Sequence, residues 1–230
     1  MSSLREKNIL VIYEDAAIIV VEKPAGIHSC AAKPEVHDPK TVEGHLQQRF
    51  PNAKLVHRLD NDTSGLLVAA KTKETFENLR KIWGSEAVTK KYLALVLGTT
   101  ERQGKIETAI AHHPRKKKKM IIDGEKARPA VTIYKTIASS QDFSLLEVSI
   151  QTGVRHQIRL HLSSIGHPIA GDLLYQTTKD LTNDSANLNR HFLHLHEIEF
   201  PHPETKKKLS FRSPLPKELS QIVQKLLPKA

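Results

Sequence analysis

The stretch His57-Arg58-Leu59-Asp60-Asn61-Asp62-Thr63-Ser64-Gly65 places two carboxylates, two hydroxyl groups, an arginine and a glycine in one predicted turn. The apolar run Leu66–Ala70 follows it directly and predicts a strand. Because Asn, Asp, Ser and Gly all favour turns, the stretch also fits an ordinary solvated turn. Its first half resembles the spacing of a calcium loop, but Lys71 stands at the twelfth position, where a bidentate Glu is required. We therefore exclude calcium.

The segments on both sides of this turn predict a mixture of strands and helices. Strands are expected at Asn8–Tyr13, Ala17–Glu22, Leu66–Ala70, Tyr92–Leu97, Ala130–Ala138, Phe143–Ile150 and Phe192–Phe200. Helices are expected at Thr41–Phe50, Thr72–Trp83, Val154–Ile165 and Pro216–Leu227. Because strands dominate and helices do not alternate with them, we predict one α+β domain over residues 1–230, with a mixed, mainly antiparallel sheet. The polar segment Tyr175–Arg190 is expected to be a surface insertion.

The overall composition is basic and contains a single cysteine. Lys and Arg number 35 against 25 Asp and Glu in 230 residues, a net charge of +10. This charge favours a polyanionic partner, although a basic protein with a solvated surface fits equally well. Cys30 alone cannot form an intramolecular disulfide or a thiolate zinc cluster, and the 13 histidines lack a completing ligand set, so no metal is expected. The chain shows no secretory signal and no apolar run near the ~20 residues of a membrane span, which predicts a soluble, cytoplasmic protein.

Four blocks of the chain carry a family resemblance. They are His57–Gly65 with the strand after it, Ala16–Gly26, Lys91–Gly98, and Thr152–Leu162 followed by Gly166–Asp172. In their order along the chain they resemble the RluA-type family of pseudouridine synthases, and together they cover most of the chain. The resemblance implies the pseudouridine synthase fold with a central catalytic cleft, and isomerisation of uridine in structured ribosomal or transfer RNA. No cofactor is expected, because the reaction neither changes oxidation state nor imports a group, and we expect a monomer.

The resemblance also assigns roles to individual residues. It makes Asp60 the catalytic carboxylate, places Tyr92 against the uracil as a possible base, and pairs Arg159 with Asp60. Arg58 would fill the stack that the extruded uridine vacates, and Ile158 would pack beside the base. These roles suit the residue types, because a permanently charged guanidinium matches a carboxylate that must stay ionised in a dry pocket. They also suit an enzyme that extrudes its target base from folded RNA.

One block departs from the family pattern. The family usually carries Arg directly after the glycine, whereas this chain has Gly153-Val154-Arg155-His156. On a helix this shift turns the charge by about 100° around the axis. Arg155 and Arg159 are four residues apart, so we expect them to share one helix face and both to reach RNA.

A run of five positive charges, Arg115, Lys116, Lys117, Lys118 and Lys119, is by default a solvated loop. Given the resemblance, we interpret it as a finger-like loop between strands that contacts RNA phosphates. Lys206–Lys208 is expected at a hairpin tip. The chain begins almost directly in the catalytic block, so we expect it to lack the small N-terminal S4-like RNA-binding domain of many relatives.

Two alternatives and one mechanistic question stay open on sequence grounds. A non-catalytic RNA-binding or RNA-chaperone protein could share the fold, because fold does not imply function. A hydrolase that cleaves the glycosidic bond would release free uracil. Within the synthase interpretation, Asp60 could attack either C1′ or C6 of the uridine.

Overall fold

The computed structural model describes residues 9–32 and 36–227, and the chain divides into two compact units. The first unit contains the chain up to Val88 together with Glu197–Ser213. The second contains Thr89–His196 and the segment from Pro214 onward. Strand β11 (Leu193–Pro201) therefore contributes residues 193–196 to the second unit and 197–201 to the first.

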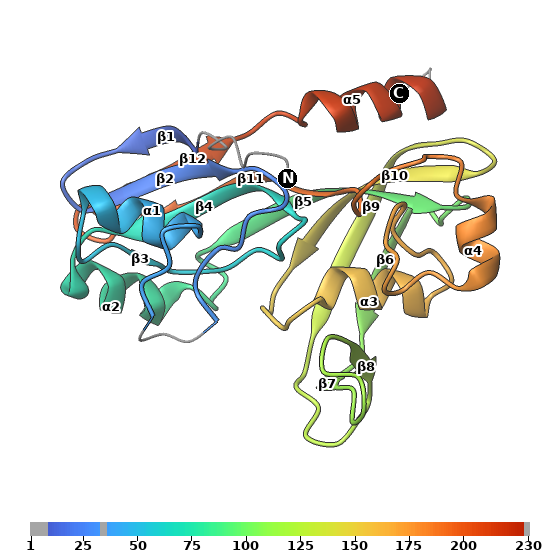
Figure 1. Ribbon diagram of the computed structural model, residues 1–230, viewed down its shortest axis with the longest axis horizontal. Helices are drawn as coiled ribbons and strands as arrows, with labels where there is room; N and C mark the ends of the chain where they lie inside the picture. The colour runs from blue at the N-terminus through green and yellow to red at the C-terminus, as the bar shows by residue number, and fades with distance from the viewer. Residues whose placement is uncertain (1–8, 33–35, 228–230) are drawn as a thin grey trace, which may run out of the picture. The chain divides into compact units, whose positions relative to one another are not determined.

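The first unit is an antiparallel sheet with two helices (Figure 1). Its elements are β1 (Leu10–Glu14), β2 (Ile18–Lys23), α1 (Val42–Arg49), β3 (Lys54–Leu55), β4 (Ser64–Ala70), α2 (Lys73–Ile82) and β12 (Lys208–Arg212). Strand β2 lies between β1 and β4, β3 also pairs with β4, and β12 pairs with residues 197–201 of β11. Every residue of β4 is buried, as its continuous apolar sequence requires. Helix α2 is capped by Thr72, whose side chain accepts the Thr75 N–H.

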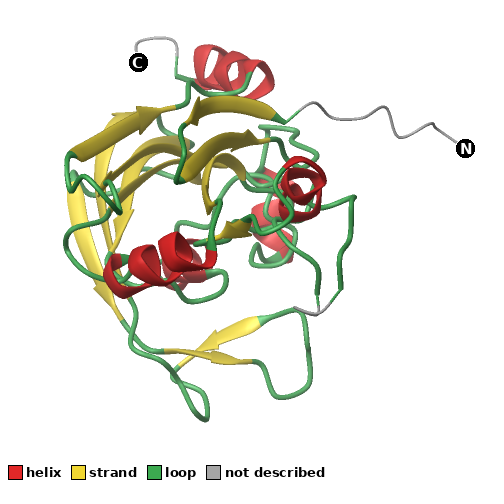
Figure 2. Ribbon diagram, turned by 90° about the vertical axis from the view of Figure 1, so that its left-hand side faces the viewer, coloured by secondary structure: helices red, strands yellow, loops and turns green. Residues whose placement is uncertain are grey.

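In the second unit, the antiparallel strands β5, β10, β9 and β6 are hydrogen-bonded in this order. Its elements are β5 (Thr89–Leu97), β6 (Gln103–Glu107), β7 (Ile110–His112), β8 (Met120–Ile122), β9 (Val131–Ser139), β10 (Phe143–Ile150), α3 (Gln157–Ser164), α4 (Thr178–Asn183) and α5 (Lys217–Leu226). Strands β7 and β8 form a separate two-stranded hairpin that extends from this sheet as an arm (Figures 1 and 2). Its base packs into a small core that contains Ile110, Met120, Leu160 and Tyr175.

The predicted fold class, α+β with a mixed, mainly antiparallel sheet and flanking helices, is confirmed, but several boundaries differ. Helix α3 begins at Gln157 rather than Val154, and the segment predicted as a surface insertion contains α4 and the buried Tyr175. The short strands β3, β6, β7, β8 and β12 were not predicted. The first predicted strand begins at Asn8, which lies outside the described residues. The central cleft and the single domain over residues 1–230 stay predictions.

Candidate functional site

Asp60 lies in the turn that leads into β4 of the first unit and is half-buried. Its backbone carbonyl accepts the Thr63 N–H at 3.2 Å, which closes the turn. The Asn61 side chain donates to Asp62 Oδ1 at 2.8 Å within the same loop. Gly65 follows with φ of 121°, a conformation that side chains with a Cβ rarely adopt. The loop therefore depends on both its polar side chains and its glycine.

A fully buried lysine fixes one side of the Asp60 loop. Lys23, at the end of β2, is 0% exposed, and its Nζ donates to the carbonyls of Pro24, Ile27 and Asn61 at 2.9, 2.7 and 2.8 Å. The Gly26 N–H also donates to the Asn61 carbonyl, at 2.9 Å. Three acceptors satisfy the three protons of the ammonium. Lys23 thus ties the turn after β2 to the residue that follows Asp60, a role that the sequence analysis missed.

The residues before Asp60 are fixed independently. The Ser29 hydroxyl donates to the Leu59 carbonyl at 2.8 Å and accepts the Leu59 N–H at 3.0 Å. His57 Nε2 accepts the Val68 N–H at 3.2 Å, and the His57 ring stacks on Trp83 with centroids 5.0 Å apart. The backbone on both sides of Asp60 is therefore held by buried groups, which preorganises the position of its carboxylate.

Arg58 lies in the same loop, is exposed, and neighbours Cys30. Burial raises the pKa of the Cys30 thiol, while the positive charge and a hydrogen bond of Arg58 act in the opposite direction. The predicted role of Arg58 in filling the vacated stack stays a prediction.

Tyr92 lies on β5 of the second unit and is 6% exposed. It is opposite Val148 of β10, which in turn is opposite Tyr134 of β9. Directly opposite residues of antiparallel strands point to the same side of the sheet. Tyr92 therefore belongs to the buried face of this sheet.

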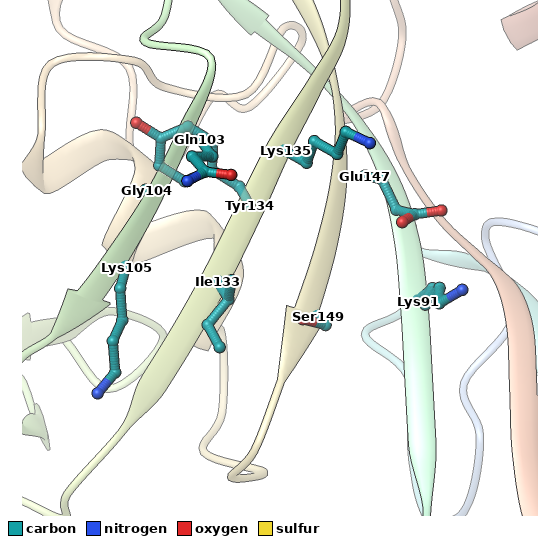
Figure 3. A pocket seen from close by; sticks show the side chains of 9 residues that line it. All are labelled: Lys91, Gln103, Gly104, Lys105, Ile133, Tyr134, Lys135, Glu147 and Ser149. Atoms are coloured by element: carbon teal, nitrogen blue, oxygen red, sulfur yellow. The ribbon is translucent and has the colours of Figure 1, made fainter.

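A groove of about 510 Å³ is lined mostly by side chains of the other face of the same sheet, although Tyr134 also lines it. Its lining side chains include Lys91, Lys105, Ile133, Lys135 and Glu147, and Figure 3 shows them along four neighbouring strands. The groove contains none of the residues that the sequence analysis singled out.

Arg159, on α3, forms a bidentate ion pair with Asp172. Its Nε donates to Oδ2 at 2.7 Å and its Nη2 donates to Oδ1 at 2.8 Å, and both residues are buried. Burial favours the neutral acid, but the hydrogen bonds and charge of Arg159 outweigh it and hold the pKa of Asp172 below its ordinary value. The guanidinium also lies 5.3 Å from the centre of the Tyr175 ring. Arg159 is thus a fixed buried cation in the second unit.

Asp172 was not among the predicted site residues, although it lies in the block Gly166–Asp172. The signal was present in the sequence as an acidic residue after Gly171 in an otherwise apolar segment. Asp60 belongs to the first unit, whereas Arg159 and Tyr92 belong to the second. The pairing of Arg159 with Asp60 therefore stays a prediction.

The start of α3 corrects the expectation for Arg155. His156 has φ of 56° and Arg155 lies in the turn before the helix, so Arg155 and Arg159 do not share a helix face. The Gln157 side chain explains this boundary: its Oε1 accepts from the Thr152 hydroxyl and the Val154 N–H at 2.9 and 3.1 Å. These bonds hold residues 152–154 in a turn. Arg155 is exposed.

The first full turn of α3 is buried. Ile158 is 4% exposed and belongs to the core of the described chain. The Gln157 Nε2 also donates to the Val131 carbonyl at 2.9 Å, which joins the helix start to β9. The predicted contact of Ile158 with the target base stays a prediction.

The predicted finger is a hairpin in the structure. Residues 113–119 connect β7 to β8, and Arg115, Lys116, Lys117 and Lys118 are exposed there. Lys119 differs, because its Nζ lies 5.4 Å from the centre of the Tyr175 ring. The Tyr175 hydroxyl accepts the Met120 N–H at 3.0 Å. The Tyr175 hydroxyl thus holds the start of β8, and the Tyr175 ring also contacts Arg159. Contact of the tip with RNA stays a prediction.

Among residues 9–32 and 36–227, no group of three or more His, Cys, Asp or Glu side chains is placed to hold a metal ion. Within the same residues, no helix is long and apolar enough to cross a membrane.

Comparison with known proteins identifies a family. The sequence model described as "RNA pseudouridylate synthase" matches residues 17–164, more than half of the chain. The chain is 37% identical over 221 residues to a ribosomal large subunit pseudouridine synthase D from Nitrosomonas europaea, covering 93% of this chain and 64% of the relative. A protein of the same name from Neisseria meningitidis serogroup A is 34% identical over 228 residues, with 94% and 60% covered. The chain thus spans somewhat less than two thirds of the length of these relatives.

Solved structures show the same fold. Human RNA Pseudouridylate Synthase Domain Containing 1 aligns with a TM-score of 0.74 and 25% identity, over 98% of this chain and 97% of that one. Human RNA Pseudouridylate Synthase Domain Containing 4 gives the same TM-score at 24% identity, over 94% and 92%.

Proposed function

This chain belongs to the RNA pseudouridylate synthase family, and we propose that it converts uridine to pseudouridine in structured RNA. The observation that carries this proposal is the family match over residues 17–164, which contains Asp60, Tyr92 and Arg159 together. Fold alone would not carry it, because a fold can persist without its chemistry. The presence of all three reactive residues favours the enzyme over a non-catalytic RNA-binding protein.

The reaction is an isomerisation. The bond between N1 of uracil and C1′ of the ribose breaks, the uracil turns, and a bond between C5 and C1′ forms. The hydrogen on C5 leaves as a proton and N1 gains a proton, so the reaction balances without an electron acceptor or an imported group. Asp60 would supply the nucleophile, as carboxylates do in other covalent mechanisms at sugars. Whether it attacks C1′ or C6 does not change this balance.

The hydrogen bonds that fix the loop around Asp60 support its proposed role as the nucleophile. A catalytic group contributes most when its position is fixed before the substrate arrives. Lys23 holds the Asn61 carbonyl, and Ser29 holds both backbone groups of Leu59. The residues on either side of Asp60 therefore do not need to rearrange on binding.

Tyr92 would act on the uracil base, and Arg159 would act on the negative charge of Asp60. Tyr92 offers a flat ring for the uracil and a hydroxyl for proton transfer. Arg159 is held in a fixed orientation by Asp172 and would stabilise the ionised form of Asp60. A double-mutant cycle of Asp60→Asn and Arg159→Lys, with the free energy of unfolding as the readout, measures that proposed coupling.

We propose ribosomal RNA of the large subunit as the substrate, because the relatives named above carry it in their names. The protein would act as a monomer in the cytoplasm. Transfer RNA is the alternative substrate. Arg58 would fill the vacated stack, and the hairpin tip, together with Arg155, would contact phosphates.

The direct test is tritium release from transcribed ribosomal and transfer RNA that carries uridine tritiated at C5. Wild-type protein is expected to release tritium from ribosomal RNA, and Asp60→Asn is expected to release none. Asp62→Asn is the matched control, since it removes a carboxylate two residues away in the same loop and should retain release. Circular dichroism of all three proteins checks that the loop variants fold.

Three results contradict the proposal in different ways. If RNA binds but no substrate releases tritium, the chain is a non-catalytic RNA-binding protein. Free uracil in the supernatant would identify a glycosidic hydrolase. Equal loss of release in Asp60→Asn and Asp62→Asn would assign the effect to the loop rather than to the nucleophile.

A further inference from the structure

Lys90 faces the same side of the sheet as Tyr92. Side chains alternate between the two faces along a strand. Lys91 lines the groove of Figure 3 and is opposite Ser149, another lining residue, so its neighbours Lys90 and Tyr92 point to the other face. Lys90 is 8% exposed there. A charged side chain is thus buried two residues from the predicted uracil contact.

The ammonium of Lys90 has no hydrogen bond or ion pair with any residue in the described ranges. Lys23 gives the contrast, because its buried ammonium reaches three carbonyl oxygens at 2.7 to 2.9 Å. The first unit therefore satisfies its buried lysine within the protein, whereas the second unit leaves Lys90 without an acceptor among the described residues.

The stem of Lys90 is buried, but its ammonium is not fully enclosed, so a ligand can reach it. Burial lowers the pKa of Lys90, and no neighbouring carboxylate of the described residues opposes that effect. A ligand with a negative charge would supply the partner that the described residues do not.

Resting on the proposed function, we infer that Lys90 binds a backbone phosphate of the RNA beside the nucleotide whose base meets Tyr92. A phosphate matches an ammonium in a poorly solvated site better than a neutral uracil carbonyl, because charge-assisted hydrogen bonds are about twice as strong. Two residues along a strand span about 6.6 Å, which is comparable to one nucleotide. Lys90 would thus position the strand while Tyr92 contacts the base.

The test compares Lys90→Met, Lys90→Arg and the control Lys135→Met. Lys135 is exposed on the groove face of the same sheet (Figure 3). RNA affinity is measured by filter binding between about 50 and 200 mM salt, and KM and kcat by tritium release. Thermal melts of the RNA-free proteins report stability.

The results expected for Lys90→Met follow from the loss of one ammonium–phosphate interaction. Lys90→Met should raise Kd and KM about ten- to a hundredfold and reduce the slope of log K against log salt by about 0.7 to 0.9. Its kcat and its melting temperature should both change little. Lys90→Arg should retain the wild-type slope, and Lys135→Met should resemble wild type in KM.

Two outcomes overturn the inference. A lower melting temperature for Lys90→Met with an unchanged salt slope would make Lys90 a packing residue. A fall in kcat with unchanged KM and slope would make it a proton-transfer residue. RNA binding tests this inference separately from the proposed function. If Lys90→Met reduces the slope of log K against log salt although wild type releases no tritium, the protein is not a synthase but Lys90 still binds a phosphate.

Discussion

Asp172 and Arg159 form a buried ion pair in which each charge depends on the other. The side chains are 0% and 9% exposed. Replacing Asp172 by Asn keeps the shape but leaves the guanidinium without its carboxylate, which in buried pairs costs about 3 to 5 kcal/mol. We expect urea unfolding to show a loss of this size, together with a lower kcat because Arg159 is no longer oriented.

A surface pair in the same unit provides the control. Lys105 and Glu107 lie 2.6 Å apart, and their side chains are 52% and 63% exposed. Exposed pairs contribute about 0 to 1 kcal/mol, so Glu107→Gln should change stability little. If both variants lose the same stability, burial does not determine the strength of the Asp172 pair.

His161 gives the protein a pH dependence of its own. It is fully buried, its Nδ1 lies 2.9 Å from the Thr132 hydroxyl and its Nε2 lies 3.1 Å from the Thr108 carbonyl. Burial lowers the pKa of His161, and the bond to Thr108 offsets this only in part. The unfolded chain then binds more protons than the folded one below the ordinary histidine pKa of about 6.5. Stability is therefore present above that pH and is lost as pH falls below it.

The measurement is the free energy of unfolding at several pH values between about 7 and 5. Wild type should lose more stability over this range than His161→Gln, which cannot take up the proton. His112→Gln, at an exposed position, should follow wild type. Parallel curves for wild type and His161→Gln would show that the buried imidazole does not contribute.

Site residues that lie in the family blocks could be named from the sequence. Residues whose roles depend on the tertiary structure could not. Asp60 and Tyr92 could be named because each lies in a distinctive pattern. Lys23, Asp172 and Lys90 could not be assigned, because their roles depend on which carbonyls or charges the tertiary structure places around them. A buried lysine with three acceptors and one with none among the described residues look the same in a sequence.

Elements with long periodic patterns were predictable, whereas short or locally constrained ones were not. The strand at Phe143–Ile150 has the predicted bounds, and its residues from Leu146 to Ile150 alternate strictly between apolar and polar. Strands β7 and β8 have three residues each, too few for a recognisable period. The apolar spacing of α3 continues back to Val154, but the bonds of Gln157 to the preceding turn override it.

The β7–β8 hairpin can be tested as an element. Replacing Lys116, Lys117 and Lys118 by Gln removes three exposed charges at its tip and leaves Lys119 on the Tyr175 ring. We expect weaker RNA binding, and a salt slope reduced by about 0.9 for each phosphate that the tip no longer neutralises. The kcat at saturating RNA should stay near wild type. An unchanged slope would show that the tip does not bind phosphates.

At the scale of the whole molecule, the net charge of +10 acts on RNA before any contact forms. Besides the hairpin tip, a second basic loop, Lys206–Lys208, leads into β12 of the first unit. Charges steer a polyanion over distances comparable to the Debye length, about 10 Å at 0.1 M salt, so steering depends on total charge more than on any one loop. A docked contact, by contrast, slows dissociation.

This difference separates the two loops kinetically. Replacing Lys206, Lys207 and Lys208 by Gln changes the net charge by the same amount as the hairpin variant. At low salt both variants should slow association with RNA by similar factors, within about twofold of each other, and added salt should remove the difference from wild type. Only the hairpin variant should dissociate faster, because only its lysines are proposed to bind phosphates. Stopped-flow association and competitor-chase dissociation measure the two rates. Faster dissociation of the Lys206–Lys208 variant would place a phosphate-binding site on the first unit as well, whereas unequal association rates would show that steering is local.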